Sequence, residues 1–272
     1  MEANEIQKQL DDVYKTVLNK EIISSQFADE EKSVLSAPFL LNIPDSYCKS
    51  KNKILYIGKE TNIWWGKIQH YIDIKNSIEI LKNRYKAEFE GGEVQRSKDI
   101  SKIKTYKPKD WGNNAFFSKF SFFEDNIKDS SILWTNLLKM DSGVDGYAKN
   151  SIHDDRIKQL SKDILLKEID ILKPDAIIFV TATSTNLKHY DSAIKNTFDN
   201  KYTNSHVIKS KELWIFEYSG IKCYRTLHPL SYQYKSKEQK HNHYKDIADD
   251  INNGFNLFKR NDKNSLKSLN VK

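Results

Sequence analysis

The amino-acid sequence predicts an α/β fold, a three-layer α/β/α sandwich with a central, mostly parallel four-stranded sheet. Three observations predict this class. Short apolar runs typical of buried strands recur along the chain. Stretches with the apolar spacing of helices alternate with these runs, as in folds whose parallel sheet is covered on both faces. Polar residues directly follow several of the runs, which is typical of the carboxyl ends of strands in an open sheet.

The first part of the chain is predicted to be helical. Residues 4–24 carry apolar residues at the spacing of an amphipathic helix, namely Ile6, Leu10, Val13, Val17 and Ile22. Two prolines then interrupt the chain before the first strand. We therefore expect residues 1–46 to form an N-terminal helical extension that packs on a domain of residues 47–259, followed by a polar tail at residues 260–272.

The first strand is predicted at Lys53–Gly58, where four consecutive apolar residues end at a glycine. Glu60 and Asn62 follow this run. In open α/β sheets, ligands bind beyond the carboxyl ends of the strands, so these two side chains are candidate site residues.

A long segment follows, and we expect it to be an insertion of about residues 63–130. It begins with Trp64 and Trp65 and continues as a helix that the pair of glycines after Glu90 would stop. The basic stretch after this helix is predicted to be a loop. The aromatic stretch at residues 111–117 is predicted to belong to the core or to wall a pocket.

The remaining strands and helices are predicted in the second half of the chain. We expect strands at residues 131–136, 175–180, 213–218 and 221–227, and helices at residues 151–173 and 244–258. Asn136, Thr181 and His228 stand at the ends of three of these strands. Because the carboxyl ends of parallel strands meet at one edge of a sheet, we expect Asn136 and His228 to converge on one pocket with Glu60 and Asn62.

The composition bears on location and on metal binding. No apolar run is long enough to cross a bilayer, and the N-terminus lacks the basic and apolar regions of a signal peptide, so we expect a cytoplasmic protein. The two cysteines, Cys48 and Cys223, are too few for a disulfide framework or a four-cysteine cluster. His241 and His243 have no matching Cys or His pair elsewhere, so we expect no metal and no cofactor.

The formal net charge of +7 is unevenly distributed. Between Lys201 and Lys245 the sequence holds nine Lys or Arg residues against three Glu, and between Arg96 and Lys109 it holds six against one Asp. Tyrosines and a tryptophan are interleaved with these charges. This mixture of positive charge and stacking surfaces favours nucleic acid as a partner.

Four short motifs occur in order between about residues 50 and 235: Gly58-Lys-Glu60, Leu133-Trp-Thr-Asn136, Leu172-Lys-Pro-Asp175 and Leu227-His228-Pro-Leu-Ser-Tyr232. In this order they resemble the landmarks of the uracil-DNA glycosylase superfamily. Those landmarks are a strand leading into Gly-x-(Asp/Asn/Glu), a strand ending in Asn, a Pro-Asp strand and a His-Pro loop. The resemblance implies the fold of that superfamily for the predicted sheet and helices.

The resemblance also implies a DNA glycosylase, which flips a damaged or modified pyrimidine-type base out of DNA and hydrolyses its N-glycosidic bond, leaving an abasic site. Glu60 would stabilise the sugar cation or orient the attacking water, and His228 would donate a hydrogen bond to the departing base. Asn136 and Asn62 would read the base edge. The implied partner is double- or single-stranded DNA, and we expect a monomer.

Further residues are implied to contact the base and the DNA. The candidates for stacking on the flipped base are Trp64, Trp65, Phe116 and Phe117. In the loop after His228, Leu230 or Tyr232 would insert into the base stack. The candidate DNA contacts are Leu230, Ser231, Tyr232, Lys235 and Lys237.

The sequence departs from the superfamily pattern in ways that leave the substrate open. Thr61 stands where a proline is common, Leu230 stands where a serine is common, and the four cysteines of the iron–sulfur subfamilies are missing. The base is either uracil or a bulky modified base such as the glucosylated hydroxymethylcytosine of phage DNA, as in an anti-phage glycosylase. Two other functions stay open: a catalytically inactive DNA-binding module, and a nucleoside or nucleotide N-glycosidase.

Overall fold

The computed structural model describes residues 2–61, 64–96, 99, 101–144, 147–148, 151–182, 187–233 and 243–259. The chain forms two compact units whose segments alternate along the sequence. The first unit combines Met1–Cys48, Lys59–Gly112 and Thr135–Leu172. The second unit combines Lys49–Gly58, Asn113–Trp134 and Lys173–Lys272. The predicted N-terminal extension therefore lies within the first unit, and the predicted tail at residues 260–272 lies outside the described residues.

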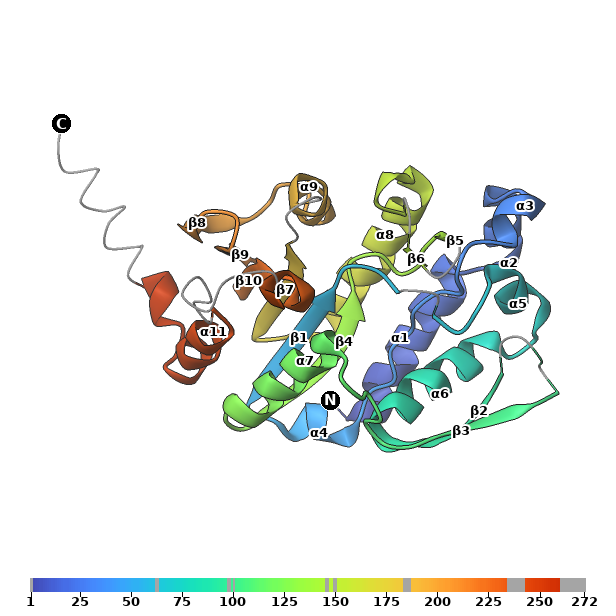
Figure 1. Cartoon of the computed structure of the whole chain (residues 1–272), viewed down its shortest axis with the longest axis horizontal. Helices are drawn as coiled ribbons and strands as arrows, with labels where there is room; N and C mark the ends of the chain where they lie inside the picture. Colours follow the sequence, from blue (N-terminus) through green and yellow to red (C-terminus); the bar gives the residue numbers. More distant parts are fainter. Residues whose placement is uncertain are drawn as a thin grey trace. The chain divides into compact units, whose positions relative to one another are not determined.

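The second unit is built on a six-stranded sheet with the strand order β4-β1-β7-β10-β9-β8 (Figure 1). The strands are β1 (Asn52–Gly58), β4 (Ser130–Asn136), β7 (Ala176–Ala182), β8 (Thr203–Lys209), β9 (Leu213–Tyr218) and β10 (Ile221–Leu227). β7 pairs in parallel with β1 and β10, whereas β9 pairs antiparallel with β10 and β8. The predicted α/β class, with a mostly parallel central sheet, is confirmed.

The number of strands was predicted wrongly, because the sheet has six strands and not four. The hairpin of β9 and β10 was expected, but β8 was not. β8 lies at the edge of the sheet; its first residues alternate between exposed and half-buried, and its last three residues are all exposed, with Val207 64% exposed. A strand without a buried face has no apolar run by which the sequence could reveal it.

Helices cover both faces of this sheet. The helices of this unit are α7 (Ala115–Asn126), α9 (Leu187–Thr197), α10 (Pro229–Gln233) and α11 (His243–Asn252). Neighbouring residues of β10 point to opposite faces. Tyr224 donates a hydrogen bond of 2.7 Å to Asp250 of α11, whereas Arg225 forms an ion pair of 2.9 Å with Asp191 of α9. α11 and α9 therefore lie on opposite faces, and α7 packs against α11.

The first unit is mainly helical. Its helices are α1 (Ala3–Val17), α2 (Lys20–Gln26), α3 (Asp29–Lys32), α4 (Asp45–Lys49), α5 (Ile68–Asp73), α6 (Ser77–Glu90), the 3-10 helix η1 (Ser151–His153) and α8 (Asp155–Leu172). The unit also contains two short antiparallel pairs of strands. β2 (Gly92–Gln95) pairs with β3 (Ile103–Tyr106), and β5 (Gly143–Val144) pairs with β6 (Tyr147–Ala148). Among the described helices, none has the length and apolar character that a membrane crossing requires.

Two expectations for the first unit change. The amphipathic N-terminal helix exists, but it ends at Val17, and Asn19 caps a separate helix by accepting two backbone N–H groups. This break shifts the helical register, so Ile22 is 48% exposed and Ile23 is buried in its place. The basic stretch predicted as a loop contains the β2–β3 hairpin, whose single buried residue, Val94, gives no strand pattern.

Four buried tyrosines make alkaline pH destabilising. Burial raises the pKa of Tyr14, Tyr56, Tyr71 and Tyr224 above the ordinary value of 10.0. Above that value an unfolded chain loses these protons while the folded protein keeps them, so the free energy of unfolding falls as pH rises from 10 toward the folded-state pKa values. Urea unfolding midpoints between pH 8 and 11 should therefore drop beyond pH 10, and Tyr56→Phe should weaken the drop. A midpoint that stays constant over this range contradicts the prediction.

Candidate functional site

In the first unit, Glu60 lies in the loop that follows β1, and Asn136 is the last residue of β4, directly before the next loop. The backbone N–H of Leu138 donates a hydrogen bond of 2.9 Å to the carbonyl oxygen of Lys59, so the two loops lie side by side. The structure therefore brings together the two chain segments in which these predicted site residues stand.

A buried polar cluster fixes these same loops. The hydroxyl of Thr61 donates to the carboxylate of Asp141, and the hydroxyl oxygens of Thr61 and Ser36 lie 3.1 Å apart. The backbone N–H of Asp141 in turn donates to Ser36 Oγ at 2.9 Å. In this chain a hydrogen-bonded threonine holds the loop after β1.

The carboxylate of Glu60 is held by a serine from a distant part of the chain. Ser151 Oγ in η1 donates a hydrogen bond of 2.6 Å to Glu60 Oε2. Ser151 is fully buried, whereas Glu60 is half-buried. Short hydrogen bonds to a carboxylate are among the stronger ones in proteins. Ser151 therefore restricts how the Glu60 carboxylate turns while that side chain keeps contact with solvent.

A cation adjoins this carboxylate. Lys59 is half-buried, and burial lowers the pKa of its ammonium group, while the negative charge of Glu60 opposes that shift. The amine of Lys59 therefore loses its proton more easily than an exposed lysine does.

The other described site candidates of the first unit are enclosed. Asn136 is 1% exposed at the end of β4, and Asn62 lies outside the described residues. Trp64 and Trp65 are each 6% exposed. The Trp64 ring lies 4.8 Å from that of Phe39, and Trp65 Nε1 donates to the carbonyl oxygen of Gln95 in β2 at 2.9 Å. Both tryptophans pack within the unit, and their stacking on a base stays a prediction.

In the second unit, His228 follows β10 and begins a turn into α10. The backbone N–H of Ser231 donates to the carbonyl oxygen of His228 at 2.8 Å. The backbone N–H of Leu230 donates to His228 Nδ1 at 3.3 Å. Because Nδ1 accepts a hydrogen bond, a neutral His228 carries its proton on Nε2. This tautomer can donate from Nε2 to an oxygen acceptor.

An aromatic cluster adjoins His228. Phe116 and Phe117 lie in the first turn of α7, and their backbone N–H groups bond to the side chain of Asn114. The Phe116 ring stacks on that of His228 with centroids 6.2 Å apart and planes at 29°. Trp134 of β4 lies 5.6 Å from Phe116 and 4.8 Å from Phe117. The structure thus brings three of the predicted residues together in this unit.

The predicted DNA contacts fall on and beyond α10. Leu230 is 49% exposed, as a side chain that inserts into DNA must be, and Ser231 is half-buried. Tyr232 is a residue of α10, and Lys235 and Lys237 lie outside the described residues. The predicted convergence of the Glu60 and Asn136 loops with His228 stays a prediction.

Two of the residues in these arrangements were not predicted from the sequence. Ser151 is 91 positions away from Glu60, and no motif marks it. Trp134 stands two residues before Asn136 in β4, and the period of two in strands places it on the same face as that candidate. The strand pattern alone could therefore have suggested Trp134.

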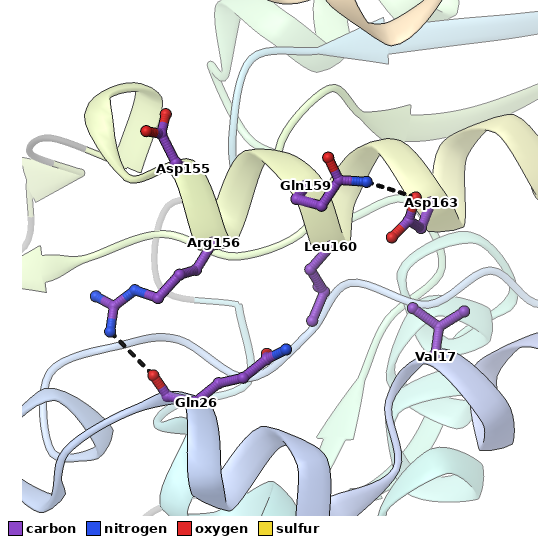
Figure 2. Close-up of a pocket in the computed structure, with 7 residues that line it drawn as sticks. All are labelled: Val17, Gln26, Asp155, Arg156, Gln159, Leu160 and Asp163. Atoms are coloured by element: carbon purple, nitrogen blue, oxygen red, sulfur yellow. Dashed lines mark hydrogen bonds between the residues drawn. The ribbon is translucent and has the colours of Figure 1, made fainter.

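The first unit also has a separate pocket of about 360 Å³ (Figure 2). It is lined by Val17, Gln26, Asp155, Arg156, Gln159, Leu160 and Asp163. Arg156 already pairs with Glu31 at 2.6 Å and donates to the carbonyl oxygen of Gln26, and Gln159 donates to Asp163. These polar groups bind one another, and none of the predicted site residues lines this pocket.

Within the described part of the chain, no three His, Cys, Asp or Glu side chains are arranged to hold a metal ion. Comparison with known proteins found no family model and no curated protein that matches this sequence. The function is therefore inferred from the residues of the two arrangements themselves.

Proposed function

We propose that the protein is a DNA glycosylase that flips a damaged or modified pyrimidine-type base out of DNA and hydrolyses its N-glycosidic bond. The observation that carries this proposal is the hydrogen bond from Ser151 that holds the Glu60 carboxylate, on a loop bonded to the loop that follows Asn136. A half-buried carboxylate in a fixed orientation suits a developing cation or an attacking water.

The chemistry divides between two ends of one bond. As the bond from the sugar carbon C1′ to the base nitrogen breaks, its electron pair leaves with the base, and positive charge builds on the sugar. Glu60 acts on the sugar side by stabilising this charge or by orienting the water that adds to C1′. His228 acts on the base side, where Nε2–H donates to an oxygen of the departing base. The products are the free base and an abasic site.

Recognition of the base uses an amide and aromatic rings. The side chain of Asn136 offers both a donor and an acceptor, which suits the edge of a pyrimidine. Phe116 and Phe117 are half-exposed at the start of α7 and offer ring faces beside His228. The base is uracil or a bulky modified base such as a glucosylated hydroxymethylcytosine.

The experiment that tests this function uses DNA oligonucleotides that carry uracil, hydroxymethylcytosine or glucosylated hydroxymethylcytosine, single-stranded and in duplex. Abasic sites are detected by strand cleavage in alkali, and free nucleosides are assayed in parallel. Excision from at least one oligonucleotide supports the proposal. DNA binding without excision would indicate an inactive DNA-binding module, and cleavage of nucleosides alone would indicate a nucleoside N-glycosidase; both outcomes overturn it.

A positioning role for Ser151 follows from the same proposal. Ser151→Ala removes the hydrogen bond to Glu60 and should lower the single-turnover excision rate by roughly tenfold. Ser151→Thr keeps the hydroxyl and should recover most of the rate.

The matched control is Ser161→Ala. The buried hydroxyl of Ser161 accepts the backbone N–H of Lys139 at 2.8 Å, so this variant should lose stability but excise at the wild-type rate when folded. Equal rates for Ser151→Ala and Ser161→Ala would show that Ser151 has only a structural role.

A further inference from the structure

The β2–β3 hairpin of the first unit forms a two-stranded ribbon that continues from the end of α6 (Figure 1). Its register pairs Gly92 with Tyr106 and Gln95 with Ile103. The backbone N–H of Arg96 donates to the carbonyl oxygen of Lys102 at 2.8 Å, so the pairing extends one step toward the tip.

The base of this ribbon is anchored. Gly91 has φ +76°, and a Cβ on it would lie 2.7 Å from Pro108 Cδ, so the close approach of the two chain segments requires glycine. The Arg84 guanidinium of α6 lies 4.1 Å from the ring centroid of Tyr106. Trp65 Nε1 donates to the carbonyl oxygen of Gln95, the residue of β2 nearest the tip. These contacts hold β3 to the unit at the base of the ribbon and β2 at its tip-side end.

Of the two strands, β3 faces solvent along most of its length. Ile103, Lys104 and Thr105 are all exposed although neighbouring strand residues point to opposite faces, so both faces of β3 are open. Ile103 is 64% exposed, among the most exposed large apolar residues described. An apolar side chain in this position is accessible to a partner.

The charge of the ribbon is positive. The described basic residues, all exposed, are Arg96, Lys102, Lys104, Lys107 and Lys109. The ribbon has two described acidic residues. Asp99 at the tip accepts hydrogen bonds from the backbone and side chain of Ser101 and pairs with Lys102 at 2.9 Å, and Glu93 lies near the base. The exposed surface therefore fits a polyanion.

We propose that this hairpin is a DNA-docking element that enters the major groove of duplex DNA. The inference rests on the proposed function for the identity of the polyanion and adds an element that the excision chemistry does not need. The major groove of B-form DNA admits a two-stranded β-ribbon. Lys102 and Lys104 contact the flanking phosphates, and Ile103 on the opposite face of β3 contacts base edges such as a thymine methyl. The deep, narrow major groove of duplex RNA does not admit such a ribbon.

The test compares two double variants that remove the same charge from the first unit. Lys102→Ala/Lys104→Ala alters the ribbon, whereas Lys8→Ala/Lys15→Ala alters exposed lysines of α1. Fluorescence anisotropy with a labelled duplex DNA should give a Kd raised roughly tenfold for the ribbon variant. The slope of log Kd against log salt concentration should also decrease by the amount expected for the loss of about two phosphate contacts. The α1 variant should bind as the wild type does, and the ribbon variant should bind duplex RNA as the wild type does.

The outcomes separate this inference from the proposed function. An unchanged Kd for the ribbon variant, equal losses for the two variants, or equal losses on DNA and RNA would each overturn the docking role, whether or not the wild type excises a base. Loss of duplex affinity in the ribbon variant alone would support the docking role even if no base is excised, and the proposed function would then fail by itself.

Discussion

Glu60→Gln is expected to lower the single-turnover excision rate by about 100-fold or more while the affinity for DNA changes little. The amide keeps the size of the side chain and an acceptor for Ser151, but it removes the negative charge that opposes the sugar cation. DNA affinity depends mainly on phosphate contacts, which this change leaves in place. His228→Ala should lower the rate by roughly 100- to 1,000-fold, as the loss of one donor to a developing negative charge does in other enzymes.

The matched controls for these two variants make the same substitutions at positions outside the proposed site. Glu90→Gln alters an exposed carboxylate that lies 3.6 Å from Lys86 in α6, and His206→Ala alters a half-buried histidine of β8. Both should excise at the wild-type rate. Rates are compared on protein whose melting temperature shows it to be folded. A near-normal rate for Glu60→Gln would defeat the catalytic assignment, and the carboxylate would then only fix the loop after β1.

The largest expected effect on stability lies at a buried ion pair in the first unit. Lys139 Nζ lies 2.5 Å from Glu168 Oε2, and neither side chain has any exposed surface. Tyr14 donates to the other carboxylate oxygen, Oε1, at 2.9 Å, and Thr135 donates to Oε2 at 3.2 Å. Burial lowers the pKa of Lys139, and the negative charge of Glu168 opposes that shift. The carboxylate of Glu168 therefore favours the charged form of the buried Lys139.

Lys139→Met should lower the free energy of unfolding by about 3–5 kcal/mol, because it leaves the Glu168 carboxylate buried without its cation. Replacing both partners, as Lys139→Met/Glu168→Leu, should recover part of this loss, since two apolar side chains need no compensating charge. The comparison is the exposed pair of Lys15 and Asp12 at 3.7 Å, whose disruption should cost less than about 1 kcal/mol. Urea unfolding measures all of these; a loss below about 1 kcal/mol for Lys139→Met would show that water reaches the carboxylate.

The sequence alone determined the elements that have a buried face. β1, β4 and β7 were predicted within two residues at each end, because each contains a continuous run of buried residues that the order of amino acids displays directly. The α8 helix was predicted for the same reason, from apolar residues at helical spacing that are buried in the structure. Glu60, Asn136 and His228 were selected as candidate site residues because a polar residue after such a run marks the end of a strand, and their role stays a prediction.

Only the tertiary structure decided the features that depend on residues far apart in the chain. β8 and the β2–β3 hairpin are largely exposed, so their pairing comes from backbone hydrogen bonds and not from an apolar pattern. Each of the two units likewise combines segments that are far apart in the sequence, and the hydrogen bond from Ser151 to Glu60 joins residues 91 positions apart. A run of apolar residues, or apolar residues at helical spacing, indicates which face of one helix or strand is buried. A hydrogen bond between two loops depends on how the whole chain folds, and no local sequence pattern records that.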